Sequence, residues 1–204
     1  MTDLPKKNIA IFISGRGSNM MALIDDMKNG KDHPGRPKLV ISDNVNAEGL
    51  IFAKQNLVET FSYNVKKEED KTDFEDKTLK VLKEKNIDLI CLAGFMKILS
   101  EKFIKAFSKP ILNIHPSLLP SFTGLDTHTR ALNAGCLIHG ATVHLITKKL
   151  DNGPILGQAI IKVSENSTSE KLKEQLLPHE HLLYKRVLRE FLRESGKKVL
   201  MPSI

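Results

Sequence analysis

Apolar runs alternate with helical patterns through the first half of the chain, and this alternation restricts the fold more than any other feature. Residues 87–93 are a near-continuous apolar run, which is typical of a strand covered on both faces. The preceding residues 72–85 space Phe74, Leu79 and Leu82 for one buried helical face. Strands that take turns with helices in this way predict an α/β fold with a single doubly wound, mostly parallel sheet.

The other predicted elements follow the same alternation. The further strands of this half are residues 8–14, 38–42, 57–63 and 111–114, and the further helices are 19–28, 47–55 and 100–107. In the second half, strand-like segments 141–147 and 155–163 flank the turn signal Asp151-Asn152-Gly153-Pro154, which predicts an antiparallel excursion.

A long C-terminal helix is predicted next. Its start is marked by a capping box at 167–170, and Pro178 should kink or split it. Its apolar stripe consists of Leu172, Leu176, Leu183, Val187 and Phe191. The 204 residues contain no repeat or linker, so we predict one domain, residues 1–204.

The composition indicates a globular chain, with 41% hydrophobic and 27% charged residues. No apolar run approaches the roughly eighteen residues that span a bilayer, and the short polar segment 1–7 predicts no signal peptide. Cys91 and Cys136 lack a CxxC partner, which predicts reduced thiols in a cytoplasmic protein. The net charge of +7 is scattered and two tyrosines offer little stacking surface, so we expect anionic small ligands and no nucleic-acid or membrane partner.

Polar side chains appear where the predicted strand 111–114 ends. Asn113 and His115 are two residues apart, so an extended backbone points both to the same side. Asn can donate to an oxyanion, and His can donate or accept near neutral pH. Pro116 and Pro120 fix the turn that follows. The pair predicts a catalytic site, with a satisfied turn as the alternative.

The segment Ser14-Gly15-Arg16-Gly17-Ser18-Asn19 joins the first predicted strand to the first helix. Glycines let the backbone approach an anion, and a helix N-terminus presents free N–H groups to it. Ser18 and Asn19 could also cap the helix, which leaves a plain capped turn as the alternative. Met20 stands where a dinucleotide fingerprint requires glycine, so only Asp43 supports that fingerprint and a monophosphate fits better.

Asp151 lies in the predicted turn, where it could serve ordinary turn chemistry. If it folds back onto His115, its carboxylate favours the imidazolium, and a cation beside Asn113 suits a developing oxyanion. His128, His139 and His144 could be proposed as metal ligands with His115. Their spacing matches no structural zinc pattern, so we expect no metal.

Six segments occur in the order and with the spacing of one family. They are ISGRGSN (13–19), DLICLAGFMKILS (88–100), LNIHPSLLP (112–120), HGATVHLI (139–146), LDNGPILGQ (150–158) and Glu180-His181. Together they resemble the phosphoribosylglycinamide formyltransferases, the folate-dependent transformylases of purine biosynthesis. The resemblance implies direct attack of the amine of glycinamide ribonucleotide on the formyl group of 10-formyltetrahydrofolate. Asn113 and protonated His115 would stabilise the oxyanion, and Asp151 would orient His115 and help a water molecule to carry protons.

The resemblance also implies two binding sites. The phosphate-binding elements would lie in the N-terminal half, and the folate and catalytic elements mainly in 88–158. The ribonucleotide would be held by Gly17, Ser18, Asn19 and Glu180. The folate would be contacted by Lys71, Met96, Lys97, Ile98, Leu99, Asn113, Thr147, Lys148, Lys149, Leu150 and Asp151.

The sequence departs from the family pattern at four positions. Lys71 stands where the family often has an arginine facing the glutamate tail of folate; the charge stays but the bidentate fork is lost. Thr123 and Asp126 replace residues of a Pro-Gly-x-His stretch, and Pro178 precedes Glu180. We expect the changes at Thr123 and Asp126 to bear on the geometry of their loop, and Pro178 to bear on the ribose contact of Glu180.

Other functions are possible on the same pattern. A methionyl-tRNA formyltransferase would need a further C-terminal domain and a formyltetrahydrofolate deformylase a further N-terminal one, and we expect no room for either. A non-catalytic phosphate- or nucleotide-sensing module is the third alternative, against which the coexistence of Asn113, His115 and Asp151 argues. A monomer and a homodimer are both compatible with the sequence.

Overall fold

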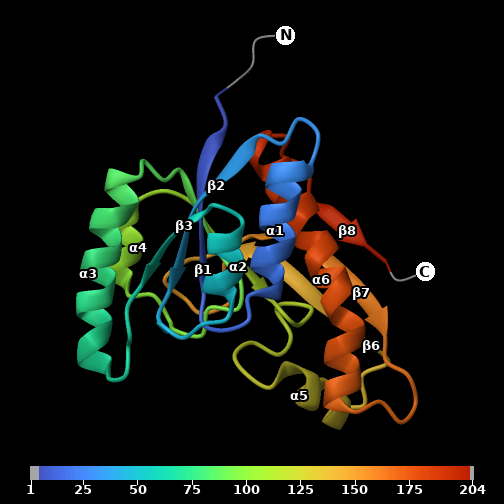
Figure 1. Cartoon of the computed structure of the whole chain (residues 1–204). Coiled ribbons are helices and arrows are strands. Elements are labelled where there is room, and N and C mark those ends of the chain that lie inside the picture. The colour runs from blue at the N-terminus through green and yellow to red at the C-terminus, as the bar shows by residue number, and fades with distance from the viewer. Residues whose placement is uncertain (1–4, 203–204) are drawn as a thin grey trace. The chain divides into compact units, whose positions relative to one another are not determined.

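A computed structural model describes residues 5–202 (Figure 1). Residues 1–4, which make up most of the segment for which no signal peptide is predicted, lie outside the described residues. The strands are hydrogen-bonded in the order β3-β2-β1-β4-β5-β6-β7-β8. The pairs β1–β2, β1–β4, β2–β3 and β7–β8 are parallel, and β6–β7 is antiparallel. The predicted doubly wound, mostly parallel sheet with an antiparallel excursion is therefore confirmed.

Residues 1–112 and 113–204 form two compact units, and their boundary falls inside β5 (Ile111–His115). The prediction that residues 1–204 make one domain stays a prediction.

The first unit contains every strand and helix predicted for it. They are β1 (Lys7–Ile13), α1 (Ser18–Asn29), β2 (Gly35–Ser42), α2 (Gly49–Gln55), β3 (Glu59–Ser62), α3 (Glu68–Glu84), β4 (Leu89–Leu92) and α4 (Glu101–Phe107). Helix α1 packs beside α2, and α3 packs beside α4 (Figure 1). Residues 9–13 of β1 are fully buried because helices cover both faces of a doubly wound sheet.

The order of the strands reverses between β1 and β4. The chain runs from β1 outward to β3 and then returns to place β4 on the other side of β1. Beyond the carboxyl ends of such a pair, the loops diverge and leave the crevice in which ligands of open α/β sheets bind. The loops after β1 and β4 are therefore the place in this unit to look for a ligand.

The second unit contains the end of β5 and a hairpin packed against a long helix. Its elements are α5 (Thr127–Asn133), β6 (Ile138–Leu145), β7 (Ile155–Lys162), α6 (Ser169–Leu192) and β8 (Val199–Met201). Helix α6 packs on β6 and β7, and its buried stripe includes Leu172, Leu176, Leu183 and Val187, as predicted. Phe191, predicted as the fifth member of the stripe, is half-buried.

The start of α6 and the effect of Pro178 differ from parts of the prediction. Its N-cap is Thr168, whose hydroxyl accepts from the Lys171 N–H, so the predicted box between Ser167 and Glu170 does not form. Pro178 does not split the helix, because a proline removes only one backbone hydrogen bond and the rest of the ladder continues. The other predicted effect, a kink at Pro178, stays a prediction. The short elements α5 and β8 were not predicted.

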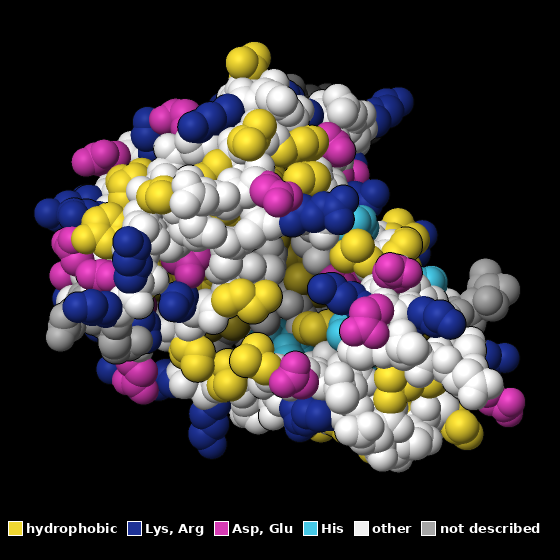
Figure 2. Space-filling model, turned by 60° about the horizontal axis from the view of Figure 1, so that its bottom comes forward, with side chains coloured by type: hydrophobic (Ala, Val, Ile, Leu, Met, Phe, Trp, Pro, Cys, Tyr) yellow, Lys and Arg dark blue, Asp and Glu magenta, His cyan; other side chains and the backbone are white. Residues whose placement is uncertain are grey.

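The distribution of charged side chains on the surface agrees with the scattered charge expected from the sequence. On the face in Figure 2, basic side chains lie among acidic ones and form no continuous stripe. Cys91 is buried, Cys136 is half-buried, and both are free thiols. Within residues 5–202, no helix has the length and apolar character that crossing a membrane requires.

Candidate active site

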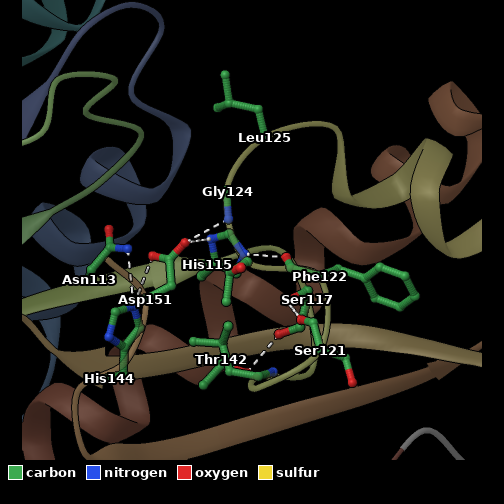
Figure 3. Close-up of polar contacts among 12 residues, drawn as sticks. Asn113, His115, Ser117, Ser121, Phe122, Gly124, Leu125, Thr142, His144 and Asp151 are labelled. Carbon is green, nitrogen blue, oxygen red and sulfur yellow. Dashed lines mark hydrogen bonds and ion pairs between the residues drawn. The ribbon is translucent and has the colours of Figure 1, made fainter. Parts of the chain in front are cut away.

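Strand β5 carries Asn113 and His115, and Figure 3 shows both beside Asp151 and His144. His115, His144 and Asp151 are all buried, with at most 7% of their surface exposed. Burial of three titratable groups in one place is costly unless they satisfy one another, so their mutual geometry decides what the site can do.

Both ring nitrogens of His115 face acceptors. Nε2 lies 2.9 Å from the carbonyl oxygen of Phe122, which can only accept, so Nε2 carries a proton. Nδ1 lies 3.6 Å from Oδ2 of Asp151. With Nε2 protonated, an ionised Asp151 faces a favourable N–H at Nδ1 only if His115 is the imidazolium. The predicted Asp–His pair is thus present, with Nδ1 of His115 directed to the carboxylate of Asp151.

Asp151 reaches this position from the turn between β6 and β7. Its φ is 48°, in the left-handed region, which an aspartate adopts more readily than most residues. Gly153 makes the turn possible, because a Cβ there would lie 1.7 Å from the carbonyl oxygen of Leu145. Oδ2 of Asp151 accepts from the Gly124 N–H at 2.9 Å, and this bond fixes the carboxylate. An ordinary turn residue has no need of such a buried partner.

His144 is the polar partner of Asn113. Its Nδ1 lies 3.0 Å from the carbonyl oxygen of Leu145 and therefore donates to it. Burial lowers the pKa of His144, although the nearby charge of Asp151 works in the opposite direction. The ring is therefore neutral near pH 7, and its free Nε2 accepts from Nδ2 of Asn113 at 3.2 Å. This bond turns the amide nitrogen of Asn113 to His144 and leaves its second N–H for a ligand.

The segment after β5 is tied to the β6–β7 hairpin. Thr142 lies at the centre: its hydroxyl donates to the Ser117 carbonyl oxygen at 2.7 Å and accepts from the Leu119 N–H at 3.0 Å. Gln158 on β7 donates to the Leu119 carbonyl oxygen at 3.0 Å. These bonds hold the start of the loop from which Phe122 and Gly124 reach His115 and Asp151 (Figure 3).

The four histidines considered as metal ligands have other partners. His139 Nε2 lies 3.1 Å from His128 Nδ1, and His139 also bonds the backbone of Pro116. Burial lowers the pKa of His139 to about 4, so this ring is neutral near pH 7. The part of the chain that the structure describes has no group of three or more His, Cys, Asp or Glu side chains placed to hold a metal ion.

The predicted phosphate loop lies in the first unit at the strand reversal. The loop after β1 contacts the loop after β4, because the Ser14 hydroxyl accepts from the Met96 N–H at 2.8 Å. Gly17, not Ser18 or Asn19, is the N-cap of α1, with φ of 70° and no side-chain cap. The alternative of a side-chain cap by Ser18 or Asn19 is therefore wrong: Gly17 adopts the left-handed conformation that glycine favours, and the two polar residues fall inside the helix.

This N-terminus suits an anion. The first turn of α1 has neither a side-chain cap nor an acidic residue, and the positive end of a helix dipole favours an anion. A Cβ at Gly17 would lie 3.0 Å from Met20 and 3.2 Å from Ile13. Because glycine has no Cβ, the backbone of the loop can lie this close to both side chains. Asn19 is 7% exposed.

The residues predicted to contact folate fall in both units. In the first unit, Met96 and Ile98 are 67% and 62% exposed after β4, Lys97 is exposed, Leu99 is buried, and Lys71 is half-buried on α3. In the second unit, residues 147–150 are exposed in the turn that ends at Asp151. Glu180, predicted for the ribose, is half-buried on α6. Their roles stay predictions.

Comparison with known proteins gives a consistent result. The sequence model of the formyl transferase family matches residues 7–188. The chain belongs to the formyl transferase family. It is similar to the phosphoribosylglycinamide formyltransferase of Haemophilus influenzae, with 38% identity over 185 residues that cover 91% of this chain and 87% of that protein. It is 40% identical over 176 residues to the trifunctional purine biosynthetic protein adenosine-3 of Gallus gallus, covering 86% of this chain and 17% of that protein.

A solved structure agrees with the sequence. Glycinamide ribonucleotide transformylase 1 from Symbiobacterium toebii superposes with a TM-score of 0.87 at 36% identity, over 95% of this chain and 90% of that one. The eight-stranded sheet and the long C-terminal helix are thus those of a formyl transferase.

Two parts of this candidate site were not predicted. His144 was considered only as a metal ligand, although its place one strand residue before Leu145, in a buried strand, is a signal that its polar atoms need partners. The backbone groups of Phe122 and Gly124 have no signal in the side-chain pattern.

Proposed function

We propose that this chain transfers the formyl group of 10-formyltetrahydrofolate to the primary amine of glycinamide ribonucleotide, a step of purine biosynthesis. The names of the relatives support the pair of substrates. The observation that carries the proposal is the buried cluster in which Asn113 keeps one N–H free beside the pair of His115 and Asp151.

The chemistry of the cluster fits acyl transfer. The amine attacks the formyl carbon, a C–N bond forms, and negative charge builds on the formyl oxygen. The free N–H of Asn113 and an N–H of His115 are the donors for that oxygen. Collapse breaks the bond between the formyl carbon and the folate nitrogen, and the proton lost by the amine is gained by this nitrogen. Asp151 keeps His115 cationic and anchors the water molecule that carries the proton.

His115 has to change partner for this role. Its Nε2–H is bonded to the Phe122 carbonyl oxygen, and its Nδ1 faces Asp151. To donate to the formyl oxygen, Nε2–H must exchange the Phe122 oxygen for that oxygen or share itself between the two. In the absence of substrate, the Phe122 carbonyl oxygen therefore takes the hydrogen bond that the oxyanion accepts during the reaction.

The proposal assigns the binding residues as the family resemblance implies. The ribonucleotide phosphate takes the N-terminus of α1 at Gly17, Ser18 and Asn19, and Glu180 takes the ribose. The exposed apolar residues Met96 and Ile98 fit a flat aromatic ring better than water. Lys71 pairs with a carboxylate of the folate tail. The proposal includes one domain in a cytoplasmic protein, with no resident metal.

A direct assay tests the proposal. Release of tetrahydrofolate from 10-formyltetrahydrofolate is followed with glycinamide ribonucleotide, with methionyl-tRNA, or with water as the only acceptor. We expect turnover with the ribonucleotide and formation of its formyl derivative by mass spectrometry. Equal turnover in water alone would point to a deformylase, and no turnover with a folded protein that binds both ligands would point to a sensing module.

An Asn113→Ala variant serves as the internal control. It removes the donor with the free N–H, so kcat should fall about 10²–10³-fold while both KM values change little. Unchanged kcat would contradict the oxyanion role of this side chain.

A further inference from the structure

One short backbone segment, residues 122–125, contacts both members of the His115–Asp151 pair. The Phe122 carbonyl oxygen bonds Nε2 of His115, and the Gly124 N–H bonds Oδ2 of Asp151 (Figure 3). The two side chains come from β5 and from the turn after β6. Their relative orientation therefore depends on the shape of this segment.

The segment does not hold that shape by local preference. Phe122 has φ of 53°, Gly124 of 78° and Asp126 of 54°, so every second residue is left-handed. For a residue such as Phe, this conformation costs about 1–2 kcal/mol. A backbone with such strain persists only where contacts from outside the segment maintain it.

Arg130 supplies such contacts. Its Nη1 donates to the carbonyl oxygens of Thr123, at 2.5 Å, and Leu125, at 3.2 Å. These two carbonyls flank Gly124, whose N–H is directed to Asp151. The guanidinium also lies 5.6 Å from the centre of the Phe122 ring, within range of a cation–π contact.

The base of Arg130 is fixed. It lies on α5, where Ala131 is fully buried and Thr127 is 2% exposed. The side chain therefore reaches from an anchored helix to residues 122–125, where its partners are the carbonyls of Thr123 and Leu125 and the ring of Phe122.

We propose that Arg130 is a positioning residue for the formyl transfer: it holds residues 122–125 in the shape that directs the Phe122 carbonyl to His115 and the Gly124 N–H to Asp151. The inference rests on the proposed function, since it assigns catalytic work to that pair. A guanidinium is suited to the task because one nitrogen carries two N–H groups and the planar group can lie on an aromatic ring.

The effect should appear in kcat. Arg130 is exposed, so its hydrogen bonds are screened and their removal should change overall stability little. A small displacement of a catalytic group, by contrast, costs about 10–100-fold in rate. Neither substrate is bound by Arg130 in this proposal, so the two KM values should stay within about threefold, a change worth less than 1 kcal/mol.

The experiment compares Arg130→Met, Arg130→Lys and the control Arg193→Met with the wild-type chain in the formyl-transfer assay. Met keeps the apolar stem but has no donor, and Lys keeps charge and donors at shorter reach. We expect kcat to fall about tenfold or more in Arg130→Met, to recover partly in Arg130→Lys and to stay unchanged in the control. Arg193 is an exposed arginine at the C-cap of α6, with a weak 4.0 Å pair to Glu190.

Two further measurements separate positioning from stability. Hydrogen exchange of the Gly124 amide, followed by NMR, should accelerate in Arg130→Met while amides of α6 keep their rates. In the Asp151→Asn background, Arg130→Met should have no further effect on kcat, because the group that it positions is already disabled.

The outcomes are distinguishable. If the wild-type chain does not formylate the ribonucleotide, the proposed function fails. If the wild-type chain formylates the ribonucleotide but Arg130→Met keeps the wild-type kcat, the positioning role is overturned. The role is also overturned if Arg130→Met lowers kcat by the same factor in the Asp151→Asn background as in the wild type. If Arg130→Met does not fold, Arg130→Lys decides: wild-type kcat together with faster exchange at Gly124 overturns the inference, and a lower kcat with that faster exchange supports it.

Discussion

Replacing His144 with Leu tests whether this ring acts on catalysis through Asn113. His144 accepts from Nδ2 of Asn113 at 3.2 Å and lies 3.7 Å from Oδ1 of Asp151. Leucine fills a similar volume but cannot accept, so the amide of Asn113 loses the contact that decides which of its two ends faces the ligand. Gln at the same position can offer an amide oxygen instead and serves as the conservative variant.

The size of the effect follows from the bond. A neutral hydrogen bond contributes about 0.5–1.5 kcal/mol net. If this free energy is what keeps Asn113 correctly oriented, its loss changes the ratio of the two amide orientations by about 2- to 12-fold, at about 1.4 kcal/mol per factor of ten. The correctly oriented fraction then falls from about 0.7–0.9 to about 0.5, so kcat should fall by up to about twofold. Removing the donor outright in Asn113→Ala should cost about 10²–10³-fold, so the His144 effect has a ceiling.

The assay is a double-mutant cycle on kcat for the ribonucleotide reaction. His144→Leu should be slow, His144→Gln should be faster than His144→Leu, and adding His144→Leu to Asn113→Ala should change nothing further. The unfolding midpoint of each variant is measured alongside, because His144 is fully buried. Equal penalties in both backgrounds would refute the argument, since His144 would then act independently of Asn113, through Asp151 at 3.7 Å.

The pH dependence gives a second signature of the same bond. Burial holds the pKa of His144 below its ordinary value, so Nε2 stays an acceptor at neutral pH. As the pH falls through the lowered pKa, Nε2 becomes a donor, and Asn113 must turn its oxygen to it, which removes the amide N–H from the substrate. The wild-type kcat should therefore show an acid loss that His144→Leu lacks, measured between pH 4.5 and 7.5 as a difference between the two profiles.

Three further predictions concern other parts of the chain. Gly153→Ala should lower both the unfolding midpoint and kcat, because its Cβ would meet the Leu145 carbonyl oxygen at 1.7 Å and displace the turn that carries Asp151; a wild-type melting curve would contradict this. Ser18→Ala should raise the KM for the ribonucleotide about tenfold or more, because loss of a hydrogen bond to a charged group costs about 1.5–3 kcal/mol. An effect on the folate KM instead would show that the loop is assigned to the wrong ligand. His139 has a folded pKa of about 4 and an ordinary value of 6.5, so the unfolded chain protonates first and stability falls from pH 6.5 to pH 4, by up to about 3 kcal/mol. Urea unfolding at pH 7 and pH 5 should show a smaller decline for His139→Asn, and an equal decline would refute this source.

The strands of the sheet could be predicted from the sequence because buried strands have a recognisable pattern of apolar residues. Residues 9–13 of β1 are fully buried and are apolar on both faces, which only a covered strand requires. Helix α6 was likewise predictable, because its apolar residues form one stripe. In α5, by contrast, only Thr127 and Ala131 are buried, and two small residues make no recognisable stripe. The three residues of β8 are too few to show an alternation.

The catalytic candidates were predictable for a related reason. Asn113 and His115 stand at the end of strand β5, and Asp151 stands in a glycine-containing turn, so residue type and position together indicate chemistry. The cap of α1 was not predictable, because three neighbouring residues could each begin the helix. The choice of Gly17 depends on packing against Met20 and Ile13, which lies outside any local rule.

What no side-chain pattern can predict is the work of the backbone around the pair. Every residue has an N–H and a carbonyl, so the sequence does not distinguish Gly124 or Phe122 from their neighbours; only the left-handed turns of residues 122–126 direct these groups to Asp151 and His115. The same bonds decide the chemistry, since the Phe122 oxygen places the proton of His115 on Nε2 and the Leu145 oxygen leaves Nε2 of His144 free to accept. Nε2 is thus a hydrogen-bond donor in His115 and an acceptor in His144, because the two rings direct different nitrogens to a backbone carbonyl.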